Sequence, residues 1–118
     1  METDKEIISF SQSEKVKGGI IWVTQAVNML QGLDGAEQKG GERVVSVLIQ
    51  MISQEAKFAK GVTRDDQWDE VDPHIEKAIL MINSGVSQEA TMHLSKALSH
   101  VTNIGQRSMT ALREKGFI

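Results

Sequence analysis

The chain has 118 residues, which is the size of one ordinary domain. Its net charge of −3 and its lack of tyrosine argue against a nucleic-acid-binding surface. The absence of cysteine excludes disulfides, thiolate metal sites and cysteine nucleophiles. The longest apolar runs, residues 20–23 and 78–82, are shorter than the ~18–20 residues that cross a bilayer, and the first residues do not resemble a signal peptide. We therefore expect a single cytoplasmic domain, residues 1–118, without a nucleic-acid or membrane partner.

Apolar residues recur at helical spacing along nearly the whole chain, and no segment alternates as a strand would. The spacing predicts four helices, at about residues 12–32, 36–61, 66–84 and 88–115. The connections between them are short, which favours an all-α fold, an up-down-up-down four-helix bundle.

The start of the first helix depends on two local signals. Ser11 and Glu14 have the spacing of a capping box, which predicts a helix start near residue 12. Residues 1–10 are then left as a short apolar arm that docks on the bundle or on another subunit. Gly18 and Gly19 weaken a helix interior, so either the helix begins after Gly19 or a neighbour packs closely there.

The first two helices carry the clearest apolar faces, which we expect to point toward the bundle core. In the first helix, the stripe is Val16, Ile20, Val23, Val27 and Leu30, widened by Trp22, Ala26, Met29 and Leu33. In the second, the face comprises Val44, Val45, Leu48, Met51, Ile52, Phe58, Ala59 and Val62.

The third helix has two alternative starts. Asp72 and Pro73 resemble an N-cap followed by proline in the first turn, where its missing N–H costs no hydrogen bond. Trp68 and Val71 continue the apolar spacing backwards, so the helix alternatively begins near Asp65 and bends at Pro73.

An acidic segment precedes and enters the third helix. It has six acids within 12 residues and no base among them: Asp65, Asp66, Asp69, Glu70, Asp72 and Glu76. Such a segment could bind a divalent cation or a basic partner, but Glu70 stands where a calcium loop needs glycine. We favour an acidic helix start that complements the helix dipole, with no metal bound. Since residues 77–118 carry two acids and five bases, we also expect the acidic segment to contact the last helix.

The last helix carries a polar stripe beside its apolar face. Its members are His93, Lys96, His100, Asn103 and Arg107. The stripe becomes more basic below pH ~6.5 and could meet an anion or an acidic surface, or it could be an ordinary solvated face. The run His93-Leu-Ser-Lys96-Ala97 resembles the motif of histidine phosphotransfer domains, which are four-helix bundles. That resemblance implies His93 as phosphoacceptor beside Lys96, although Ala97 replaces the family's glycine and the histidine lies on the last helix.

Glu55 is the single charge in the middle of the second helix's apolar face. A buried carboxylate with a raised pKa could serve catalysis or a small-ligand or anion pocket. We favour the alternative, in which Glu55 pairs with a base from another helix or lies at the edge of the bundle.

No catalytic, metal or cofactor motif is recognisable; the Glu-x-x-His pairs of di-iron bundles are missing, for example. Gly105, Ser108 and several alanines make the last helix shallow enough for close helix packing. Six methionines and the apolar arm suit an adaptable contact surface. The leading hypothesis is therefore a non-enzymatic bundle that binds protein, most simply a second copy as a homodimer. The alternatives are phosphotransfer through His93 and a ligand-binding bundle.

Overall fold

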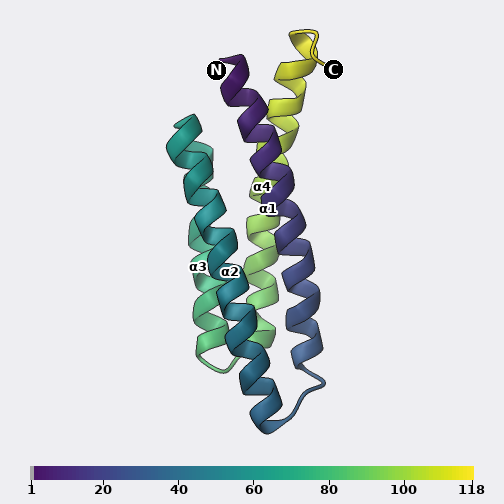
Figure 1. Cartoon of the computed structure of the whole chain (residues 1–118), viewed down its shortest axis with the longest axis vertical. Helices are drawn as coiled ribbons and strands as arrows, with labels where there is room; N and C mark the ends of the chain where they lie inside the picture. Colours follow the sequence, from purple (N-terminus) through teal and green to yellow (C-terminus); the bar gives the residue numbers. More distant parts are fainter. Residues whose placement is uncertain (1) are drawn as a thin grey trace.

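The structure is a computed structural model that describes residues 2–118. It contains four long helices and two short 3-10 helices: α1 (Thr3–Leu30), α2 (Gly35–Thr63), η1 (Asp66–Glu70), α3 (Asp72–Asn83), η2 (Ser87–Glu89) and α4 (Ala90–Glu114). The described residues include no strand. α1 packs against α2 and α4, and α3 also packs against both (Figure 1). The predicted up-down-up-down four-helix bundle is therefore confirmed.

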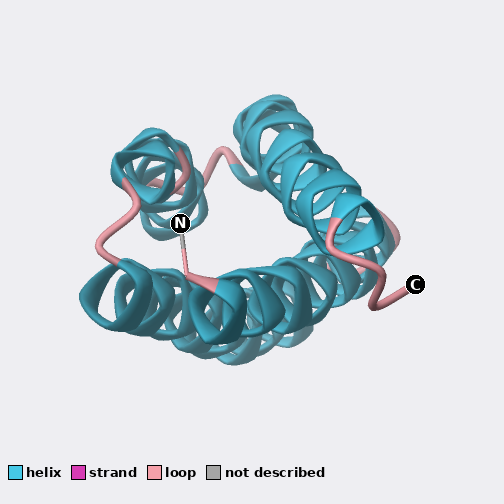
Figure 2. Ribbon diagram, turned by 90° about the horizontal axis from the view of Figure 1, so that it is seen from above, coloured by secondary structure: helices cyan, strands magenta, loops and turns pink. Residues whose placement is uncertain are grey.

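The bundle is elongated, with extents of 53 × 22 × 18 Å. Figure 2 looks along its length and shows the helices tilted against one another rather than parallel. The two ends of the chain lie at the same end of the molecule, where α1 begins and α4 finishes (Figure 1).

α1 begins at Thr3, so the predictions of a capped start near residue 12 and of a docking arm at residues 1–10 are wrong. Asp4 and Glu6 lie in the first turn, where acids interact favourably with the helix dipole. The Glu6 carboxylate also accepts a hydrogen bond from the Lys115 ammonium group at 2.8 Å, which ties this turn to the end of α4. This contact with the end of α4 thus stabilises helical turns that precede the expected start near residue 12.

Small side chains join α1 to α4 at this end of the bundle. Ser9 and Ser13 of α1 and Gly105 and Ser108 of α4 are all buried. A Cβ added at Gly105 would lie 2.7 Å from the Ser13 hydroxyl oxygen, so the two backbones come close. The shallow face that the sequence predicts for the last helix is present here.

Gly18 and Gly19 lie inside α1 without interrupting it. A Cβ at Gly19 would lie 3.1 Å from a side-chain carbon of Ile52 on α2, whereas one at Gly18 would meet nothing within 4 Å. Of the two alternatives for this pair, close packing by a neighbour is therefore correct for Gly19.

The core contains the stripe predicted for α1 but only part of the face predicted for α2. Val16, Ile20, Val23, Val27 and Leu30 are all buried. On α2 the buried stripe is Val45, Ile49, Ile52, Ala56 and Ala59. The prediction that Trp22 and Met29 widen the core face of α1 is wrong, because both are exposed. The same holds on α2 for residues that were expected in the core, namely Val44, Leu48, Met51, Phe58 and Val62. The apolar surface of α2 is therefore wider than the part that the bundle covers.

The third helix begins at Asp72, with Pro73 in its first turn. Trp68 and Val71 are buried ahead of it, as their spacing predicts, but Trp68 lies on η1 rather than on a bent helix. η1 contacts α2, α3 and α4, so the Trp68 side chain fills the space among these helices. Pro73 therefore starts the helix and does not bend it.

The two glycine environments give a matched test of packing. Gly18→Ala should raise the free energy of unfolding by about 0.5–1 kcal/mol, because it reduces backbone freedom without a clash. Gly105→Ala should lower it by about 1–2 kcal/mol, because the new methyl group overlaps Ser13. Chemical denaturation measures both. If Gly105→Ala were as stable as Gly18→Ala, the close approach of α1 and α4 would be incorrect. Adding Ser13→Ala to Gly105→Ala should restore part of the loss.

Candidate functional site

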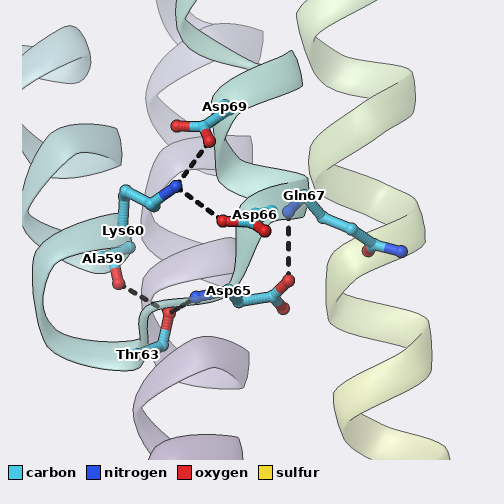
Figure 3. Close-up of polar contacts among 7 residues, drawn as sticks. All are labelled: Ala59, Lys60, Thr63, Asp65, Asp66, Gln67 and Asp69. Atoms are coloured by element: carbon cyan, nitrogen blue, oxygen red, sulfur yellow. Dashed lines mark hydrogen bonds and ion pairs between the residues drawn. The ribbon is translucent and has the colours of Figure 1, made fainter.

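The link between α2 and η1 fixes where the acidic segment begins (Figure 3). Arg64 ends α2 in the left-handed conformation, with φ of 56°. The Thr63 hydroxyl donates to the Ala59 carbonyl at 2.7 Å and accepts from the Asp65 N–H at 3.3 Å. The Asp65 carboxylate in turn accepts from the Gln67 N–H at 3.0 Å and caps η1.

Lysines of α2 face this segment. The Lys60 ammonium group lies 2.9 Å from the Asp66 carboxylate and 2.5 Å from that of Asp69 (Figure 3). The hydrogen bonds to Asp69 and then Asp66 raise the pKa of Lys60. Both acids therefore share one cation of the preceding helix.

A second group of contacts joins the start of α3 to α2. The Ser53 hydroxyl lies 2.6 Å from the Asp72 carboxylate and 3.2 Å from that of Glu76. Lys57 reaches the same two carboxylates at 3.6 and 3.3 Å, and the charge of Asp72 is the largest cause of its raised pKa.

The acidic segment also contacts α4, as the charge distribution predicts. Arg107 forms an ion pair with Asp65, and the His100 Nδ1 atom lies 3.2 Å from the Glu70 carboxylate. All six acids of the segment are thus engaged within the chain. Residues 2–118 contain no group of three potential metal ligands close enough to hold an ion. The arrangement therefore supports a structural role for these acids.

Sequence analysis did not single out His74, which stacks on His100 with ring centroids 5.3 Å apart and planes 10° apart. Burial, and next the charge of His100, lowers the pKa of His74, and its Nδ1 atom is buried without a hydrogen-bond partner. His74 lies on α3, directly after Pro73, and not on the last helix. The spacing of polar residues along the last helix therefore could not indicate it. Two of the predicted stripe members, His93 and Lys96, precede His100 on α4; His93 is half-buried and Lys96 is exposed.

Glu55 is paired and lies at the edge of the bundle. Its carboxylate is 2.7 Å from the Lys15 ammonium group, and the Gln12 amide donates to it at 3.3 Å. These two hydrogen bonds, that from Lys15 first, lower its pKa. The hypothesis of a raised pKa at Glu55 is therefore wrong, and the expected partner is a lysine of α1.

Most of the exposed large apolar side chains among residues 2–118 lie on the outside of α1 and α2. Residues 2–118 include fourteen large apolar side chains that are exposed, and eight belong to this surface. We call it the α1–α2 face: Trp22 and Met29 of α1, with Val44, Val47, Leu48, Met51, Phe58 and Val62 of α2. Trp22 and Met29 are 77% and 75% exposed.

Most of these residues follow a second heptad-like spacing, offset by one residue from the buried stripe. On α2 the outer stripe is Val44, Leu48, Met51, Glu55, Phe58 and Val62, with steps of four and three. On α1 it is Lys15, Gly19, Trp22, Ala26 and Met29, with the same steps. This spacing is typical of helices that pack against other helices. It is visible in the sequence, where it merges with the core stripe into one broad face.

A groove of about 380 Å³ runs between the two outer stripes. It is lined by Lys15, Val16, Gly19, Trp22, Val23, Ala26, Leu48, Met51, Ile52 and Glu55. Gly19 and Ala26 leave room beside the larger Trp22 and Met51. The charged lining residues are Lys15 and Glu55, which neutralise each other. The groove therefore suits apolar side chains better than a charged ligand.

Comparisons with protein-family models, curated proteins and solved structures find no match to this chain. A search of the helices in residues 2–118 finds none with the length and apolar character needed to span a membrane. The function is therefore argued from the geometry of the chain itself.

The lowered pKa of His74 predicts acid sensitivity. Folding disfavours the protonated ring, whereas the unfolded chain binds a proton near the ordinary pKa of 6.5. The free energy of unfolding should therefore fall as the pH is lowered from 7 to 5, and His74→Gln should flatten this dependence. Urea denaturation at pH 8, 6 and 5 measures it, with the pH 8 value recording any loss of packing. An equal slope in the variant would contradict the assignment. Glu55 contributes in a separate window below its ordinary value of 4.5.

Proposed function

We propose that this chain is a non-enzymatic protein-interaction module and that the α1–α2 face is its binding surface. The observation that carries the proposal is the second apolar stripe on each of two adjacent helices, which is exposed beside the stripe that forms the buried core. An apolar patch of several side chains on one face marks an interaction site more often than chance exposure.

The chemistry of the face supports binding rather than catalysis. Met29 and Met51 supply flexible, polarizable contacts, and Trp22 supplies a large anchor. A catalytic carboxylate at neutral pH usually needs a raised pKa, whereas that of Glu55 is lowered by Lys15 and Gln12. Cytoplasmic location is part of this proposal, and cell fractionation checks it.

Phosphotransfer through His93 is the alternative function. The four-helix architecture and the exposed Lys96 near His93 favour it. Against it, Ala97 stands where the family has glycine, and His93 lies on the last helix. We expect neither the wild type nor His93→Gln to take up phosphate from acetyl phosphate; labelling lost only in the variant would establish the alternative.

Site-specific photo-crosslinking tests the interaction proposal. A benzophenone amino acid at residue 22 should form protein adducts in cells, because Trp22 is the most exposed side chain of the face. The same group at residue 92, where Met92 is exposed on α4, is the control and should form few or none. Gel electrophoresis and mass spectrometry identify the adducts. Equal labelling at both positions, or none at residue 22, would refute the proposed surface.

A further inference from the structure

We infer that the partner of the α1–α2 face is a second copy of this chain, related by a twofold axis that runs along the helices in the plane of the face. The inference rests on the proposed function and names its partner. In this dimer α1 of each copy lies on α2 of the other, and the four outer stripes form a second apolar core.

The size of the face matches what a stable dimer needs. Its eight exposed apolar side chains each present on the order of 100 Å² to solvent. Together they approach the roughly 800 Å² per partner of a standard interface. Since a twofold axis uses the same patch on both copies, no other surface is required.

The shape of the α1–α2 face is also self-complementary. The side chains that stand out most, Trp22 and Met29, are on α1, while those of α2 are between 37% and 61% exposed. A twofold axis along the helices places the higher α1 stripe of one copy over the lower α2 stripe of the other. Gly19 and Ala26, which line the groove, leave room for the incoming side chains.

The charges of the face fit the same arrangement. Lys15 and Glu55 lie at one level of the bundle, 2.7 Å apart, on the two helices that the axis exchanges. The rotation keeps that level, so Lys15 faces Glu55 of the partner subunit and four charges alternate in sign. The outer stripes contain no further charge.

Analytical ultracentrifugation over a concentration series tests the dimer, with a matched pair of variants. Met51 and Met92 are 54% and 53% exposed, on the face and on α4 respectively. Met51→Lys should raise the dimer Kd at least about 100-fold, because the substitution enters a twofold interface twice. Met92→Lys should leave the Kd unchanged. Circular dichroism confirms that both variants fold, which their exposed positions favour.

Tryptophan quenching supplies an independent readout from the unmodified chain. The protein has two tryptophans, of which Trp68 is 1% exposed and Trp22 is 77% exposed. Iodide should quench Trp22 in the dilute monomer and lose access to it as the concentration rises. In Met51→Lys the quenching should stay constant over the same range.

The outcomes separate this inference from the proposed function. A monomer at all concentrations, with quenching of Trp22 unchanged, overturns the second copy. Crosslinks from residue 22 to a different protein would then leave the proposed function standing. A dimer that Met51→Lys does not weaken overturns the inference as well, because the copies would meet through another surface.

Discussion

A helix in a four-helix bundle buries only the stripe that points at the bundle axis, and α1 and α2 each carry two such stripes side by side. The inner stripes, such as Val16 to Leu30 of α1, belong to the buried core. The large apolar side chains of the outer stripes, such as Trp22 and Met51, then remain exposed within residues 2–118. An apolar stripe about 100° wide suffices for a surface helix, and the extra width is costly in water. The extra apolar width of α1 and α2 places exposed apolar surface on these two helices. This surface is the reason for proposing a helical partner.

The acids of the segment at residues 65–76, in contrast, have partners inside the chain. Each exposed ion pair of the acidic segment contributes only about 0–1 kcal/mol. Their combined effect is positional, because Lys60 and Arg107 hold the two sides of η1 while Trp68 is inserted among three helices. The contrast between acids that have partners within the chain and an apolar surface that is left exposed makes an apolar partner more consistent with this molecule than an ionic one.

Periodicity was enough to predict the helix order, the topology and the α1 core stripe, since these depend on local spacing. Periodicity could not predict that Val45 of α2 is buried while Val44 is exposed. Both residues belong to one broad apolar face, and their burial depends on which of them a neighbouring helix covers. The start at Thr3 was missed because contacts with α4, such as Glu6 to Lys115, override the local capping signal at Ser11. The sequence predicts that Glu55 pairs with a base from another helix. It does not identify Lys15 as that base, because the choice depends on the register between α1 and α2.

The pairing of the first helix with the last one also orders the folding of the chain. Contacts from α2 to α3 join residues that are closer in sequence, such as Ser53 with Glu76, 23 positions apart, and Ser46 with Asn83, 37 positions apart. The contact between Glu6 and Lys115 closes a separation of 109 residues, which costs more chain entropy. Its interface consists largely of small side chains, so it recovers little hydrophobic energy. The junction of the termini is therefore expected to form last and open first, with its amide hydrogens exchanging ahead of those in the middle of the bundle.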